Sequence, residues 1–105
     1  MLAFAALADD TRRRIVETLA DRESSVGDLV AQFAISQPAV SQHLKVLRQA
    51  GLVRVRPEAQ RRLYSLDRGG VGEIESWLDR HIRRVARQLD ALERHLDEIM
   101  EAGDG

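Results

Sequence analysis

Apolar positions at helical spacing predict a helix from Gln37 to Ala50, and the other elements can be placed around it. Val40, Leu44 and Leu47 recur at steps of four and three residues, which puts them on one face of a helix. Gly51 follows directly, and glycine is the residue that most often ends a helix in a left-handed conformation. The pattern therefore predicts both the buried face of this helix and the point where it stops.

The other face of this predicted helix carries amides, a hydroxyl group and cations, and it contains no acid. Glutamine can pair bidentately with adenine, serine can donate or accept a hydrogen bond, and lysine and arginine bind guanine or phosphate. These side-chain types predict a DNA-binding face. Its members are Gln37, Ser41, Gln42, Lys45 and Arg48.

The segments before this helix predict three shorter helices. Apolar side chains favour a first helix over residues 2–7 and a second over residues 11–20. A third helix is expected from its N-cap at Ser25 to Phe33. Only Ala34 and Ile35 separate this third helix from Ser36, the expected N-cap of the helix that starts at Gln37. Two helices joined by so tight a turn, the second polar on its outer face, predict a helix-turn-helix.

Beyond Gly51 the pattern changes to the period of a β-strand. Apolar and basic residues alternate after Leu52 and again from Arg61 to Leu66, which predicts a two-stranded hairpin, or wing, over residues 52–66. The intervening turn, Pro57 to Gln60, contains no glycine. We therefore expect a loop of about four residues built on Pro57 and not a two-residue turn.

Charge is distributed unevenly along the chain. The net charge is -1, but residues 36–66 carry six basic side chains and one acidic side chain, so basic charge gathers around the predicted helix-turn-helix. A solvated basic face would give the same count. Arginines at the base and tip of a wing can bind the DNA backbone or enter a minor groove. Arg54, Arg61 and Arg62 therefore join the predicted DNA-binding residues.

Two features near this face are expected to be structural. Arg12 to Arg14 fall in the first turn of the helix over residues 11–20, where pairing with Asp9, Asp10 or Glu17 is favoured over a phosphate contact. His43 lies inside the predicted recognition helix and is expected to pack beside its apolar face, not to contact DNA.

A long amphipathic helix is predicted over residues 72–101. Its apolar residues are spaced alternately three and four apart, which forms a heptad-like seam. A domain of this size has little use for such a seam unless a second copy covers it, so we expect a homodimer formed through the terminal helices. The expected interface residues are Leu2, Phe4, Ile82, Val85, Leu89, Leu92 and Leu96.

Length and composition exclude several other classes. The 105 residues predict a single domain, and no apolar run approaches the roughly 20 residues of a membrane span. The apolar start lacks a basic region and a cleavage site, so it is expected to be a core helix and not a signal peptide, and the protein is expected to be cytoplasmic. Without cysteine there is no disulfide framework. No convergent catalytic group or cofactor site is found, so an enzyme is not expected.

Three runs of sequence, ALADDTRRRIVETLAD, SVGDLVAQFAISQPAVSQHLKVLRQAGLV and RRLYSLD, resemble the ArsR/SmtB family of bacterial winged helix-turn-helix repressors. The resemblance extends over nearly the whole chain. It implies a mainly α fold with a small β-hairpin, and a homodimer that binds an inverted repeat in double-stranded DNA until an unidentified effector lowers its affinity. The alternative is a winged-helix protein-interaction module without specific DNA binding, although interaction faces normally show more apolar surface.

The metal sites of the family are not reproduced here. Ser25 and Gly27 stand where the thiolate sensors have a Cys-x-Cys pair. A second family site joins an Asp-x-His of one subunit to a His-x-x-Glu of the other. The corresponding residues here are Asp79, His81, His95 and Glu98. Their histidines lie about one helical turn, or about 4.5 Å, farther apart than in the family, too far for a tetrahedral zinc site, so no metal is expected.

Overall fold

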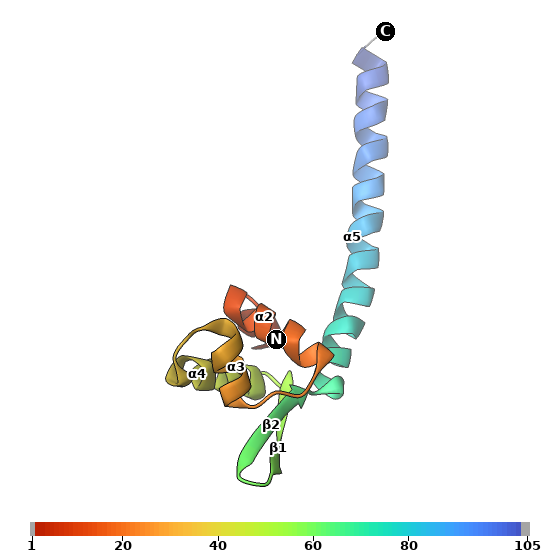
Figure 1. The fold of residues 1–105 in the computed structure, drawn as a ribbon. Coiled ribbons are helices and arrows are strands. Elements are labelled where there is room, and N and C mark those ends of the chain that lie inside the picture. The colour runs from red at the N-terminus through yellow and green to blue at the C-terminus, as the bar shows by residue number, and fades with distance from the viewer. Residues whose placement is uncertain (1, 104–105) are drawn as a thin grey trace. The chain divides into compact units, whose positions relative to one another are not determined.

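The computed structural model describes residues 2–103 and contains five helices and one β-hairpin within that range (Figure 1). The expected fold class, mainly α with a small hairpin, is confirmed. The elements are α1 (Leu2–Ala6), α2 (Asp10–Asp21), α3 (Val26–Phe33), α4 (Gln37–Gln49), β1 (Val53–Glu58), β2 (Arg61–Leu66) and α5 (Arg68–Gly103).

Residues up to Glu73 form one compact unit, and residues from Ile74 onward form a second. The single domain expected over residues 1–105 stays a prediction, and positions 1, 104 and 105 of that range lie outside the described residues.

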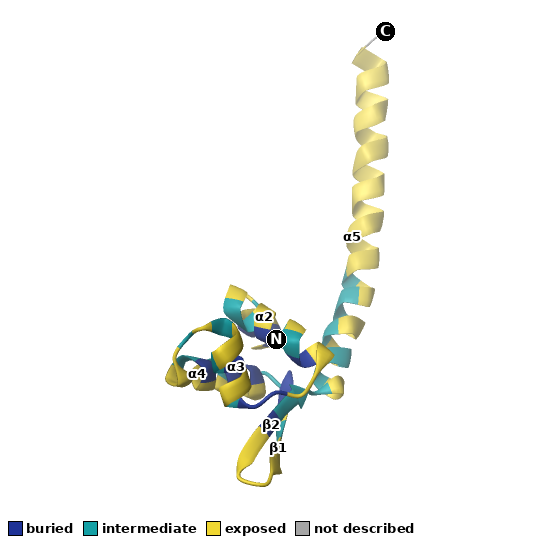
Figure 2. Ribbon diagram, viewed as in Figure 1, coloured by how far each residue is buried: buried dark blue, intermediate teal, exposed yellow. Residues whose placement is uncertain are grey.

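The first unit is built around α4, which packs against α1, α2, α3 and β1. Val40, Leu44 and Leu47 are almost fully buried, as their spacing predicts (Figure 2). The rest of the apolar core comes from α1, α2, α3, the two strands and the residue just before β1. Its members are Ala3, Ala6, Ile15, Leu19, Leu29, Leu52, Val53 and Leu63.

The predicted helix-turn-helix is confirmed by its caps. The Ser25 hydroxyl oxygen accepts a hydrogen bond from the Asp28 backbone N–H at 3.1 Å, and the Asp28 carboxylate accepts one from the Ser25 N–H at 3.0 Å. The hydrogen bond from the Ser25 N–H to the carboxylate lowers the pKa of Asp28. Ala34 ends α3 with a φ of 54°, and the Ser36 hydroxyl then caps α4. The two helices are thereby joined by the tight turn that the sequence predicts.

The end of α4 also follows the prediction, within one residue. Gly51 has a φ of +78°, a conformation that glycine adopts without steric cost. Its N–H donates to the Arg48 carbonyl and the Leu52 N–H donates to the Leu47 carbonyl, both at 3.0 Å. This paired closure stops the helix at Gln49 and leads directly into β1.

The wing is present, but the expected four-residue loop is wrong. Strand β1 continues through Pro57 and Glu58, which pair with Arg62 and Arg61, so the loop contains only two residues. Ala59 adopts a φ of 55° and takes the place that glycine usually fills. Pro57 is tolerated because β1 has a free outer edge, where a missing N–H breaks no ladder bond.

Strand β2 has a second partner that the sequence does not reveal. Ser24 and Tyr64 exchange two backbone hydrogen bonds, of 3.0 and 2.9 Å. This bridge attaches the segment before α3 to the base of the wing. Backbone hydrogen bonds therefore connect the helix-turn-helix to the wing.

Helix α5 begins at Arg68, four residues before the predicted start, and reaches Gly103 instead of residue 101. The prediction was wrong because two consecutive glycines disfavour a helix interior. Here the Asp67 carboxylate accepts hydrogen bonds from the N–H groups of Gly69 and Gly70 and stabilises the first turn. Gly70 lies directly against the Gly51 backbone, where a Cβ would overlap the Gly51 carbonyl oxygen.

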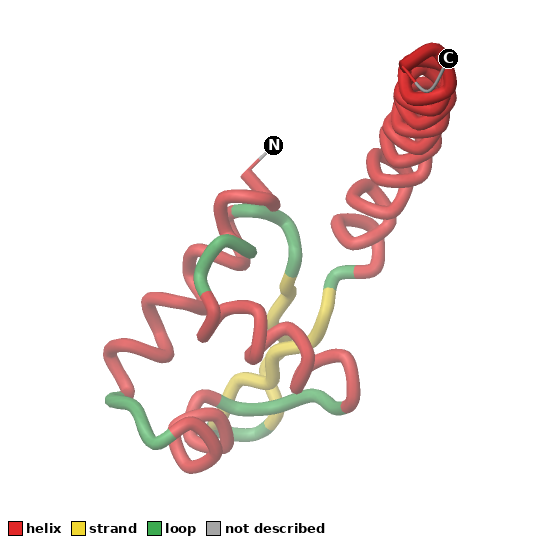
Figure 3. Tube along the Cα trace, turned by 90° about the horizontal axis from the view of Figure 1, so that it is seen from above, coloured by secondary structure: helices red, strands yellow, loops and turns green. Residues whose placement is uncertain are grey.

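The chain from Arg68 to Gly103 is one unbroken helix of 36 residues, about 54 Å long (Figure 3). None of its residues is fully buried. No helix within residues 2–103 is both long enough and apolar enough to cross a membrane.

Candidate nucleic-acid interface

The outer face of α4 is fully open to solvent. All five residues expected to contact DNA are exposed, and the buried apolar residues lie on the opposite side of the helix (Figure 2). Among residues 2–103, the side chains of Lys45 and Arg48 make no ion pair with another side chain and no hydrogen bond. Their charges are therefore available to an external anion.

Gln49 extends this face, although the sequence analysis did not select it. It follows Gln42 by seven residues, which is two helical turns, so both side chains project from the same side of α4. Gln49 is exposed. The helical period alone would have identified it.

The wing presents basic side chains on both of its faces. Arg54, Arg61 and Arg62 are exposed, as expected. Arg61 and Arg62 are consecutive in β2, so they project to opposite faces of the hairpin. Arg61 lies 3.8 Å from Glu58, a long and exposed ion pair. A wing with cations on both faces can contact phosphates on either side of a groove.

Arg56 differs from the other wing arginines. Its guanidinium donates two hydrogen bonds of 2.9 Å to the carboxylate of Glu23, and this pairing lowers the pKa of Glu23. The fork geometry attaches the wing to the segment before α3. Arg56 is therefore a structural residue of the wing.

The arginines at the start of α2 also have partners within the chain, as expected. Arg13 pairs with Asp10 at 3.3 Å and donates to the Leu7 carbonyl at 3.0 Å. The guanidinium carbon of Arg14 lies 5.0 Å from the centre of the Phe33 ring, a cation–π contact between α2 and α3. These side chains stabilise the packing of the helices.

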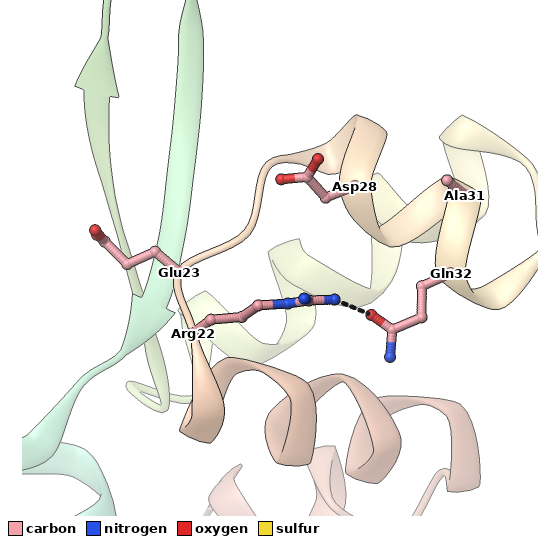
Figure 4. A pocket seen from close by; sticks show the side chains of 5 residues that line it. All are labelled: Arg22, Glu23, Asp28, Ala31 and Gln32. Atoms are coloured by element: carbon pink, nitrogen blue, oxygen red, sulfur yellow. Dashed lines mark hydrogen bonds between the residues drawn. The ribbon is translucent and has the colours of Figure 1, made fainter.

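A shallow open depression lies between α2, α3 and the base of the wing (Figure 4). The Arg22 guanidinium donates to the Gln32 side-chain oxygen at 3.4 Å, and the Gln32 amide donates to Thr18 at 2.9 Å. Its carboxylates, Glu23 and Asp28, are engaged by Arg56 and by the Ser25 cap. The polar groups that line the depression are therefore already paired, with one another or with neighbouring residues.

The four residues of the candidate metal set do not come together within one chain. Asp79 pairs with Arg83 at 3.1 Å. The ring of His81 stacks on Trp77 with a centroid distance of 4.1 Å, and its Nδ1 lies 2.8 Å from the Trp77 carbonyl. His95 follows 14 positions later on the same helix, about 21 Å away. Within residues 2–103, no three His, Cys, Asp or Glu side chains form a group that could hold a metal ion.

The residues expected at a dimer interface are exposed in the single chain. On α1, Leu2 is 70% exposed and Phe4 is 37% exposed. On α5, the apolar seam is 49% to 57% exposed along its length. Its members are Ile82, Val85, Leu89, Leu92, Leu96 and Ile99.

Comparison with known proteins agrees with this geometry. Residues 9–55 match the family of bacterial regulatory proteins called the arsR family. The chain is 53% identical over 83 residues to the HTH-type transcriptional regulator Rv2034 of Mycobacterium tuberculosis, covering 79% of this chain and 78% of the relative. It is 32% identical to the transcriptional repressor SdpR of Bacillus subtilis, covering 82% of this chain and 96% of the relative.

Among solved structures, an ArsR-like transcriptional regulator from Rhodococcus sp. RHA1 superposes with a TM-score of 0.77 at 26% identity, covering 92% of this chain and 89% of the other. The family match, the relatives and the fold agree with one another. The chain belongs to the ArsR family of bacterial winged helix-turn-helix transcriptional regulators.

Proposed function

We propose that this protein is a homodimeric repressor that binds an inverted-repeat operator in double-stranded DNA. The observation that carries the proposal is the outer face of α4, which is exposed, rich in amides and cations, and free of acids. DNA-binding regulation is the role of the family, and the name of the relative SdpR supports repression.

The residues divide into base readers and phosphate contacts. Gln37, Ser41 and Gln42 lie in the first half of α4, the part of a recognition helix that meets base edges in the major groove. Lys45 and Arg48 fall farther along the helix and bind phosphate. In the wing, Arg54, Arg61 and Arg62 bind the backbone or enter the adjacent minor groove.

The solvent-exposed apolar residues of the single chain support dimerisation. A seam of six aliphatic side chains, each about half exposed, extends over more than four turns of α5. A second copy is the occupant that a symmetric operator requires, because a two-fold protein matches a two-fold DNA site. In such a dimer the two recognition helices lie about 34 Å apart, one turn of B-DNA.

In this proposal the protein represses transcription in the cytoplasm by occupying the operator. The proposed mechanism includes no metal and no cofactor. The candidate metal residues are paired within the chain or separated along α5.

A gel-shift assay on the promoter of the protein's own gene, compared with scrambled DNA of the same composition, tests the proposal. At low salt we expect binding to both, with a preference for the promoter that grows as salt rises, because the non-specific contacts are mainly phosphate contacts. Failure to bind either DNA at low salt would instead favour the protein-interaction module.

A further inference from the structure

Arg12 joins three elements of the first unit through one side chain. Its Nε donates to the carbonyl of Ala6, the last residue of α1, at 2.6 Å. Its Nη1 lies 3.4 Å from Nδ1 of His43 on α4. Its own backbone N–H is bound at 3.0 Å by Asp9, the N-cap of α2. The end of α1, the start of α2 and the recognition helix therefore meet at this guanidinium.

The chemistry of the contact fixes the state of the imidazole. A guanidinium can only donate hydrogen bonds, so Nδ1 of His43 must be the acceptor and the ring proton must be on Nε2. The backbone hydrogen bond from Arg12, together with the nearby charge of its guanidinium, lowers the pKa of Asp9. Arg12 is thus held by Asp9 at its backbone N–H and by His43 at its guanidinium.

His43 occupies the flank of α4 and not its outer face. It follows Gln42 directly, so its side chain is turned about 100° around the helix axis. His43 is half-buried, whereas Gln42 is exposed. A change in the contact with Arg12 would rotate or shift α4 and move the base-reading side chains without removing any of them.

We propose that Arg12 and His43 are positioning residues for DNA recognition, which hold α4 at the angle where Gln37, Ser41 and Gln42 meet base edges. The inference rests on the proposed function. It also connects α1, which carries the exposed Leu2 and Phe4, to the recognition helix through the Ala6 carbonyl.

Two substitutions of His43 separate positioning from direct DNA contact. The amide oxygen of His43→Asn falls near the place of Nδ1 and keeps an acceptor for Arg12. The amide of His43→Gln falls near the place of Nε2 and loses that acceptor. We expect His43→Asn to bind promoter DNA within about twofold of the wild type and His43→Gln to bind roughly five- to tenfold more weakly, the range of one ordinary intramolecular hydrogen bond.

The Arg12 side gives a second test. Arg12→Met should lose roughly as much promoter affinity as His43→Gln, and the double variant should lose no more than the worse single variant, because both changes break one contact. Arg13→Met, at a neighbouring exposed arginine with its own internal partners, is the control for loss of a positive charge at the start of α2, and any change in affinity should be equal on promoter and scrambled DNA.

Several results would overturn the inference. They are retention of binding by His43→Gln with loss by His43→Asn, additive losses in the double variant, and equal losses on promoter and scrambled DNA. The asparagine and glutamine pair remains decisive even if Arg12→Met does not fold. Absence of binding by the wild-type protein would refute the proposed function itself, so the two failures are distinguishable.

Discussion

At the scale of single residues, side chains of one type have different roles because of their partners. Arg56 is held in a bidentate pair by Glu23, Arg12 joins α1 to α4, and Arg62 makes no ion pair with another described residue. An arginine of the last kind carries a charge that is free for DNA. The absence of a strong partner within the chain therefore helps to select the arginines that we propose to contact DNA.

Gln42→Ala tests base reading. We expect operator affinity to fall by roughly 1–3 kcal/mol while affinity for non-specific DNA changes little, because a bidentate amide–adenine pair is lost but no charge. Fluorescence anisotropy on both DNAs measures the two effects. Gln88→Ala, an exposed glutamine on α5, is the matched control and should change neither affinity. Equal losses on both DNAs would contradict a base-reading role.

Arg62→Ala tests phosphate contact by the wing. Binding should weaken on all DNAs, and the slope of log affinity against log salt concentration should fall by about 1, since one phosphate contact is removed. Arg56→Ala is the matched arginine control; it should leave the salt slope unchanged and lower the thermal unfolding midpoint instead. A salt slope that falls for Arg56→Ala and not for Arg62→Ala would reverse the assignment.

At the scale of elements, the end of α4 and the start of α5 fix the positions of the recognition helix and the wing. The turn after α4 uses Gly51 at positive φ, and the start of α5 brings Gly70 against that same turn. The recognition helix, the wing and the first turn of α5 are therefore fixed by two glycines that meet backbone to backbone. This contact lies entirely within the first unit.

Gly70→Ala should destabilise the protein by about 1–3 kcal/mol, because the added methyl group would overlap the Gly51 carbonyl oxygen. Gly72→Ala is the matched control. Its Cβ would meet nothing within 4 Å, so the helix should gain about 0.5–1 kcal/mol. Urea unfolding measures both variants. Equal stabilities of the two would show that the close approach does not exist.

Much at this scale was predictable from the sequence. The caps at Ser25, Ser36 and Gly51 and the buried face of α4 depend on local side-chain chemistry and period, which a single sequence displays. The two-residue wing loop was not predictable, because Ala59 at positive φ is maintained by the strands on either side and not by its own preference.

The contacts that bring distant segments together were also not predictable. Arg12 and His43 are 31 residues apart, and Glu23 and Arg56 are 33 residues apart, so neither pair shares a period or a local motif. The residues proposed to bind DNA could be selected from the sequence because all of them are on one helix or one hairpin. The early start of α5 could not be predicted, because the reason for a glycine at position 70 is its close packing against the Gly51 backbone, which the sequence does not display.

At the scale of the whole molecule, the proposed homodimer requires that a second copy covers the apolar seam of α5. Replacing Leu89 and Leu92 together by Asp should give monomers, because two charges would have to be buried without partners. Sedimentation measures the change, and operator affinity should fall with it. Ala91→Asp, an exposed position between them on the other side of the helix, is the control and should remain dimeric. A dimer that survives the double change would place the interface elsewhere.

Metal independence is a further expectation at this scale. Operator affinity of chelator-treated protein should be unchanged by zinc, cobalt or nickel, because the histidines of α5 are out of register for a shared site. Release of DNA by one of these metals, abolished by His95→Gln, would show that Asp79, His81, His95 and Glu98 of two chains do form a site.

The most direct test of the central claim is selection of bound sequences from random double-stranded DNA by the purified protein. We expect enrichment of an inverted repeat with half-sites about 10 base pairs apart, bound by two chains and enriched less strongly by a Gln42→Ala variant. Recovery of unenriched random sequence at every salt concentration would contradict it, because the face of α4 would then read no bases.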